Sequence, residues 1–152
     1  MARVGIVIGS KTDEQFIQPA LDILGEFKID FDLSILSAHR KPDSVRQYAM
    51  EAASRGYEVI IAAAGSAAHL PGVIASWTTL PVIGVPLPTS DLKGIDSLYS
   101  IIQMPGGVPV ACVGIGTAGA KNAALLAAQM LSIKYEPVRK LFADYKRRLA
   151  ES

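Results

Sequence analysis

Short apolar runs alternate along this chain with segments whose apolar residues recur at helical spacing. The apolar runs predict five strands, at 3–9, 31–36, 57–64, 81–85 and 108–113. The helical patterns cover 13–27, 42–56, 70–77, 96–104, 118–131 and 134–149. Repeated strand–helix units indicate a parallel sheet with helices on both faces. The continuous apolar character of the strands agrees with this, because such strands are covered on both sides.

Five strands in 152 residues predict a three-layer α/β/α fold, a doubly wound sheet of the flavodoxin-like type with an extra C-terminal helix. Fold frequency, rather than any particular residue, favours the strand order 2-1-3-4-5. We expect a single catalytic domain over residues 1–152, because one core suits this length and no internal repeat or low-complexity segment is visible.

The two C-terminal helical segments carry more apolar surface than a small domain requires. Segment 118–131 is apolar on nearly all sides, which implies burial on all sides. Segment 134–149 has one apolar stripe, formed by Tyr135, Val138, Leu141, Phe142, Tyr145 and Leu149. Either this stripe packs on its own domain, or the helix at 134–150 docks on a neighbouring subunit. Together the two segments favour a homo-oligomer.

Composition and charge narrow the possible partners. The formal net charge of +1 gives no reason to expect nucleic acid or an anionic membrane as a partner. No uninterrupted apolar stretch reaches the roughly 18–20 residues of a membrane span, and no secretory leader is visible. The single cysteine, Cys112, excludes an intrachain disulfide and stands in an apolar run that predicts core packing. We therefore expect a cytoplasmic protein.

The chain has only two histidines, and each follows the end of a predicted strand. His39 stands in the segment 37–42, and His69 in the segment 65–72. A third polar segment, 9–13, follows the first strand. Ligands bind at the edge of a parallel sheet where the carboxyl ends of the strands lie. We therefore expect the three segments to share one crevice.

The segment Gly9-Ser10-Lys11-Thr12-Asp13 predicts a phosphate site at the start of a helix. Helix N-termini bind phosphate through free backbone N–H groups and the helix dipole, and the hydroxyls of Ser10 and Thr12 add donors. A plain N-cap formed by Ser10, Thr12 or Asp13 explains the same residues without a ligand.

The second and third segments add a cation and two groups able to move protons. The planar guanidinium of Arg40 pairs well with phosphate, and histidine, with a reference pKa of about 6.5, moves protons at neutral pH. Solvated Arg40 and a structural His39 are the alternatives. The small residues of 65–72 admit a ligand close to the backbone, and His69 acts there as a proton carrier, a second polar contact or a structural group.

Other chemistries lack their motifs. Two histidines and one cysteine without ligand spacing predict no metal site. No Walker loop and no G-x-S-x-G nucleophile motif occurs. Segment 114–119 matches G-x-G-x-x-G, but no acidic residue ends a further strand about 20 residues later. We therefore interpret these glycines as permitting tight loop packing, not as a nicotinamide site.

Taken together, the segments resemble the phosphoribosylaminoimidazole carboxylase family in its mutase form. The resemblance runs from Gly5 to about Leu131 and rests on the segments 9–13, 37–40, 64–72, 96–105 and 116–126. The family commonly has glycine at the position of Ser66 and often serine at that of Thr12.

The resemblance implies a step of de novo purine (IMP) biosynthesis by a homo-octamer. A carboxylate moves from the exocyclic nitrogen of N5-carboxyaminoimidazole ribonucleotide to ring carbon 4, without ATP, metal or another cofactor. Carried over, the 5′-phosphate binds Ser10, Thr12 and Arg40, and the ribose binds Asp13, while Ser37 supports its loop. His39 moves the proton, and Gly65, Ser66, Ala67 and Leu70 line the base and carbon dioxide pocket with His69 as a second contact.

Two alternatives stay open. One is a related enzyme that carboxylates aminoimidazole ribonucleotide directly with carbon dioxide, although the loop 67–72 resembles the mutase group more. The other is a non-catalytic, flavodoxin-like module that binds a nucleotide or a flavin. The loop 86–94, rich in proline and polar residues, is a candidate cover for the crevice.

Overall fold

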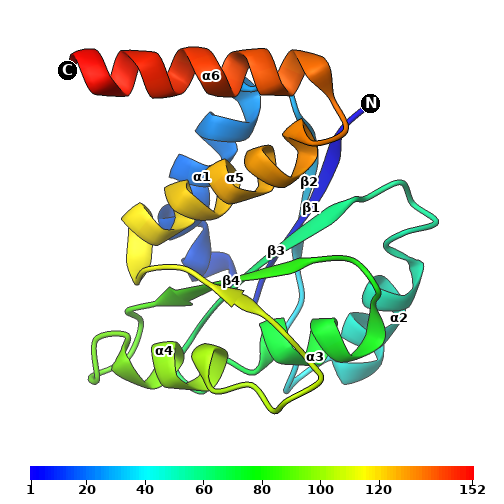
Figure 1. Cartoon of the computed structure of the whole chain (residues 1–152). Coiled ribbons are helices and arrows are strands. Elements are labelled where there is room, and N and C mark those ends of the chain that lie inside the picture. The colour runs from blue at the N-terminus through cyan, green and yellow to red at the C-terminus, as the bar shows by residue number, and fades with distance from the viewer.

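A five-stranded parallel sheet lies between two layers of helices in the computed structural model, which describes residues 1–152 (Figure 1). The strands are β1 (Arg3–Ile8), β2 (Asp30–Ile35), β3 (Val59–Gly65), β4 (Val82–Leu87) and β5 (Ala111–Cys112). Their order is β2-β1-β3-β4-β5, and every neighbouring pair is parallel. The predicted fold class and strand order are confirmed.

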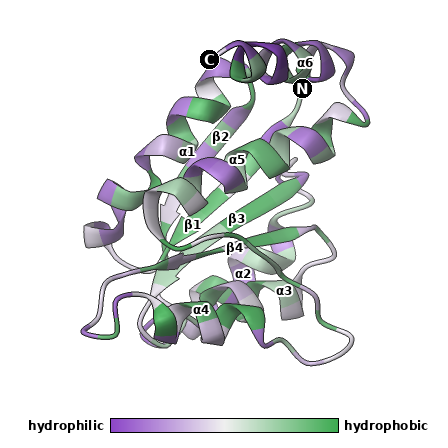
Figure 2. Cartoon of the chain, turned by 60° about the vertical axis from the view of Figure 1, so that its left-hand side comes forward, coloured by the Kyte–Doolittle hydropathy of each residue, from purple (hydrophilic) through white to green (hydrophobic).

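Each face of the sheet has its own helix layer and its own apolar core. One layer contains α1 (Glu14–Glu26), α5 (Gly116–Ser132) and α6 (Glu136–Glu151). The other contains α2 (Pro42–Glu51), α3 (Leu70–Trp77) and α4 (Ile95–Ile102). Figure 2 shows the hydrophobic strands β3 and β4 between these layers. Side chains alternate across β1, so that Ile6 and Ile8 enter one core and Val7 enters the other.

Several element boundaries differ from those predicted. The strand predicted at 108–113 shrinks to Ala111–Cys112, and Pro109 has no N–H to offer to a ladder. The helix predicted from Asp13 is preceded by a 3-10 turn at Lys11–Asp13, because Ser10 caps the chain there. The helix predicted to run to residue 56 ends at Glu51, and a turn follows to Gly56, which has φ 86°.

Among the glycines of segment 114–119, Gly119 is the one whose missing side chain permits close packing. A Cβ atom on Gly119 would lie 1.6 Å from the carbonyl oxygen of Gly114, so the backbone of α5 touches the loop before it. We expect Gly119→Ala to lower the free energy of unfolding by about 3 kcal/mol, because backbone cannot give way as a flexible side chain does. Urea unfolding measures this change.

Gly25→Ala in α1 is the matched control for that substitution. No atom lies within 4 Å of a Cβ at Gly25. Alanine should therefore stabilise α1 by about 0.5–1 kcal/mol through its better helix propensity. Equal unfolding midpoints for Gly119→Ala and the wild type would show that the contact with Gly114 imposes no constraint.

Most of the apolar stripe of α6 packs on its own chain. The ring of Phe27 lies 5.7 Å from that of Phe142 and 5.9 Å from that of Tyr145, centroid to centroid. Val138 is buried, and the Tyr135 hydroxyl donates to Glu58 at 2.6 Å. Leu149, the last member of the stripe, is exposed. The first of the two interpretations therefore accounts for the stripe, and docking of this helix on a neighbouring subunit stays a prediction.

Burial of α5 within one chain is incomplete. Ala123, Ala127 and Leu131 are buried against the sheet layer, whereas Leu125 and Leu126 are only half-buried.

None of the helices combines the length and the hydropathy that crossing a membrane requires.

Candidate active site

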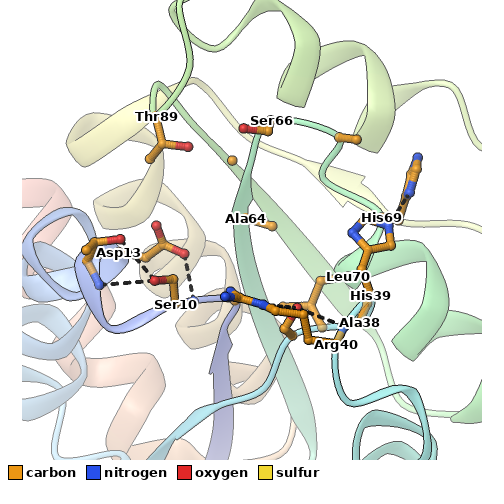
Figure 3. A pocket seen from close by; sticks show the side chains of 15 residues that line it. Ser10, Asp13, Ala38, His39, Arg40, Ala64, Ser66, His69, Leu70 and Thr89 are labelled. Atoms are coloured by element: carbon orange, nitrogen blue, oxygen red, sulfur yellow. Dashed lines mark hydrogen bonds between the residues drawn. The ribbon is translucent and has the colours of Figure 1, made fainter.

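One pocket at the carboxyl ends of the central strands contains all the residues that the sequence analysis selected (Figure 3). Its volume of about 360 Å³ lies within the range that small-molecule sites occupy. The lining residues are Gly9, Ser10, Thr12, Asp13, Ser37, Ala38, His39, Arg40, Ala64, Gly65, Ser66, Ala67, His69, Leu70 and Thr89. The expectation that three loops share one crevice therefore holds in space.

The loop after β1 forms a capping box that also faces the pocket. The Thr12 N–H donates to Ser10 Oγ at 3.4 Å, and the Ser10 N–H donates to Asp13 Oδ2 at 3.1 Å. The hydroxyls of Ser10 and Thr12 lie 3.0 Å apart. Capping and ligand binding are thus compatible, because the capping hydroxyls remain in the pocket lining.

Asp13 is the buried charge of the pocket. Only 5% of the residue is exposed, and this burial raises the pKa of its carboxyl group. The backbone N–H groups of Ser10 and Gly9 and the charge of Arg40 oppose that rise. The carboxyl group is held by the Ser10 N–H and has little access to bulk solvent.

The loop after β2 holds Arg40 through Ser37. Ser37 Oγ accepts from the backbone N–H of Arg40 at 3.3 Å and from its Nε at 3.3 Å. In Figure 3 the guanidinium extends toward Ser10. Because the only side-chain bond of Arg40 within the chain uses Nε, its terminal amino groups are free for an anion. These bonds are of the kind expected if Ser37 supports the loop.

The two histidines contact each other directly. His39 Nε2 and His69 Nδ1 lie 2.7 Å apart, and the two rings are nearly perpendicular at 88°. Such a bond requires one donor and one acceptor, so the two facing nitrogens share a single proton. Both protonating at once would break the contact. The pair can therefore store one proton and pass it between the two rings.

The loop after β3 exposes its backbone to the pocket. The side chains of Ala64 and Ala67 are small and Gly65 has none, so they leave the backbone of the loop accessible from the pocket. Ser66 in the same loop has a left-handed φ of 52°. His69 immediately precedes α3, and its carbonyl accepts from the Val73 N–H at 2.9 Å. The start of α3 thus sets the position of His69 opposite His39.

Thr89 is a lining residue that the sequence analysis did not select. It stands two residues beyond β4, in the loop 86–94 that the sequence predicts as a cover for the crevice. The rule that the carboxyl ends of parallel strands gather at one edge applies equally to this position.

In the whole molecule, no group of three or more histidine, cysteine or acidic residues is arranged to hold a metal ion.

The comparisons of sequence with known proteins agree on one family. The sequence model of the AIR carboxylase family matches residues 3–152. A protein from Thermotoga maritima named N5-carboxyaminoimidazole ribonucleotide mutase is 56% identical over 149 residues, which cover 98% of this chain and 86% of the relative. A protein of the same name from Saccharolobus solfataricus is 58% identical over 136 residues, covering 90% of this chain and 85% of the relative.

A solved structure has the same architecture. The crystal structure of PurE from Treponema denticola superimposes with a TM-score of 0.90 and 27% sequence identity, covering 99% of this chain and 93% of that one. The similarity therefore extends over the whole chain in sequence and in fold.

Proposed function

The chain belongs to the AIR carboxylase family, and from this premise we propose that it is an isomerase of IMP biosynthesis. It converts N5-carboxyaminoimidazole ribonucleotide to 4-carboxy-5-aminoimidazole ribonucleotide by moving the carboxylate from nitrogen to carbon. The observation that carries this proposal is the paired His39 and His69 in the same pocket as a phosphate-type loop. Relatives that are about half identical and bear the mutase name support this reaction rather than direct carboxylation.

Different parts of the substrate bind to different loops, according to the charge and size of the side chains there. The 5′-phosphate binds the hydroxyls of Ser10 and Thr12 and the free guanidinium nitrogens of Arg40. The neighbouring Asp13 carboxylate accepts hydrogen bonds from the ribose. The small residues of β3 and its loop allow the imidazole ring to lie against backbone.

The reaction needs one proton delivered and one proton removed. His39 donates a proton to the exocyclic nitrogen as the nitrogen–carbon bond breaks and carbon dioxide leaves. Ring carbon 4 then bonds to the carbon dioxide, and His39 removes the proton from that carbon so that the ring regains its aromaticity. The proton count balances, so no cofactor is consumed. His69, 2.7 Å from His39, orients the imidazole and can hold the recovered proton between one turnover and the next.

Carbon dioxide must remain in the pocket between bond cleavage and bond formation. A closed site keeps it oriented and raises its effective concentration at the ring carbon. The loop 86–94, which places Thr89 at the pocket, is the segment we propose as the cover.

Feeding the purified protein each nucleotide separately tests the proposed reaction. We expect conversion of N5-carboxyaminoimidazole ribonucleotide without ATP, metal or bicarbonate. Turnover only of aminoimidazole ribonucleotide with bicarbonate would instead identify a direct carboxylase. A flavin absorbance band in the pure protein, with neither activity, would identify a binding module.

His69→Asn tests the role of the histidine pair. We expect kcat to fall by about 10–100-fold while nucleotide affinity changes little, because asparagine cannot hold the shared proton but still offers polar atoms. Steady-state kinetics and calorimetric binding measure the two quantities. An unchanged kcat would restrict His69 to a structural role at the start of α3.

We also propose that the protein is a cytoplasmic homo-oligomer, and an octamer by resemblance to the family. On α4, Ile95, Tyr99 and Ile102 share one side at helical spacing, and 47–63% of each residue is exposed in the single chain. A second copy of the chain is the occupant that would cover them.

Light scattering after size-exclusion chromatography tests this proposal. We expect a mass eight times that of one chain, and a smaller assembly for Tyr99→Glu, because the substitution places a charge in the apolar side of α4. A monomeric wild-type protein would contradict the proposal. An octameric Tyr99→Glu variant would show that α4 is not at the interface.

A further inference from the structure

Thr89 is a polar residue of the pocket lining that has no role in binding or proton transfer in the proposed mechanism. Arg40 with Ser10 and Thr12 forms the anion site, and the histidines form the reactive site. Thr89 approaches from the loop after β4 and belongs to neither group. In Figure 3 its side chain lies on the same side of the pocket as Asp13, away from His39 and His69.

The position of Thr89 is set by a glycine on the neighbouring strand. Gly65 pairs with Leu87 across β3 and β4, so Thr89, two residues later, lies against the end of β3. A Cβ on Gly65 would lie 1.6 Å from Thr89 Oγ1 and 2.9 Å from its Cβ. The missing side chain of Gly65 therefore makes the space that Thr89 occupies.

The residue next to Thr89 is fixed at the head of α4. Ser90 Oγ donates to Asp96 Oδ2 at 2.6 Å and accepts from the Leu92 N–H at 3.1 Å. The hydrogen bond from Ser90 lowers the pKa of Asp96, which agrees with a stable ionised acceptor. Thr89 is thus held between a strand and an anchored turn, although its own side chain is exposed to the pocket.

The charge of Asp13 limits what can bind on this side. The phosphate on this side has Arg40 and two hydroxyls to hold it, so the parts of the substrate left to pair with the Asp13 carboxylate are its neutral hydroxyl groups, not its own carboxylate. Vicinal hydroxyls of a sugar donate to a carboxylate, which only accepts, while a threonine hydroxyl both donates and accepts. Asp13 and Thr89, which line the same side of the pocket, therefore offer complementary groups to the two hydroxyls of a sugar.

We propose that Thr89 is a specificity-determining residue, which together with Asp13 recognises the vicinal hydroxyls of the substrate's ribose. The pocket then prefers a ribonucleotide over the corresponding deoxyribonucleotides. This proposal rests on the proposed function, since it concerns the same nucleotide in the same site. It extends the site from three loops to four.

Calorimetric titration with three nucleotides tests the proposal without requiring turnover. The ligands are 4-carboxy-5-aminoimidazole ribonucleotide and its 2′-deoxy and 3′-deoxy forms, and the variants are Thr89→Val and Thr89→Ser. We expect Thr89→Val to weaken binding of the ribonucleotide by about tenfold, as the loss of one hydrogen bond in a closed site does. For one deoxy form, the same substitution should change affinity less than about twofold, because the hydroxyl that Thr89 binds is already absent.

The two variants of Thr89 distinguish the contribution of its hydroxyl to affinity from that of its side-chain shape. Thr89→Ser keeps the hydroxyl and should bind all three nucleotides within about threefold of the wild type. Thr79→Val removes an exposed threonine outside the pocket and is the matched control. Equal losses for all three nucleotides in Thr89→Val, or no loss, would overturn the role of Thr89. A wild-type protein that binds none of them would overturn the proposed function instead.

Discussion

His39→Asn is expected to reduce turnover by about 10³–10⁴-fold while the protein stays folded and binds its nucleotide. A positioned acid or base contributes about 10²–10⁴ to a rate, and His39 is proposed to act in both proton steps, which favours the upper part of that range. The histidine is exposed at the end of a loop and contributes to neither apolar core. Asparagine therefore removes proton transfer without removing packing.

Steady-state kinetics and calorimetry with the product nucleotide together test this prediction. Lys41→Gln is the matched control, because Lys41 lies two residues away, is exposed and does not line the pocket. The control should retain the wild-type kcat. Comparable turnover in His39→Asn and in the wild type would remove His39 from the mechanism, whereas loss of both binding and activity would point to a role in holding the substrate.

Arg40→Leu is expected to weaken nucleotide binding by about 10–100-fold and to change kcat much less. A hydrogen bond to a charged group contributes about 1.5–3 kcal/mol, which corresponds to this range of affinity. Arg40 is the only guanidinium that lines the pocket, and its terminal nitrogens are free. The phosphate is remote from the reacting atoms, so the loss falls mainly on binding in the ground state.

Salt provides an independent measure of the same contact. Nucleotide affinity of the wild type should fall as ionic strength rises, and that dependence should be weaker in Arg40→Leu. Arg40→Lys should lie between the two proteins, because it keeps the charge but loses the planar pair of donors and the Nε bond to Ser37. An unchanged affinity in Arg40→Leu would contradict the phosphate role.

The sequence predicts the layered architecture because periodicity reports burial directly. The alternation between apolar runs and helical patterns identifies five strands and the helices between them, and the rule for parallel sheets gathers their ends at one edge. Three of the four pocket loops follow from that rule, since each carries residues with recognisable chemistry. The capping role of Ser10 and its place in the pocket also follow from the same short motif.

Other features depend on distances that a linear pattern does not contain. His39 and His69 stand 30 positions apart, and their 2.7 Å contact results from the relative register of β2 and β3 through β1. Thr89 has no motif of its own, and its place depends on the missing Cβ of Gly65. The contact of α6 with Phe27 likewise requires the packing of three helices, so the stripe alone left two interpretations open.

A crystal structure of the protein with 4-carboxy-5-aminoimidazole ribonucleotide tests the central claim most directly. The account predicts the phosphate on Ser10, Thr12 and Arg40, with ring carbon 4 and its carboxylate next to the imidazole of His39. A nucleotide bound with its phosphate away from Arg40, or with its ring beyond the reach of His39, would contradict the account.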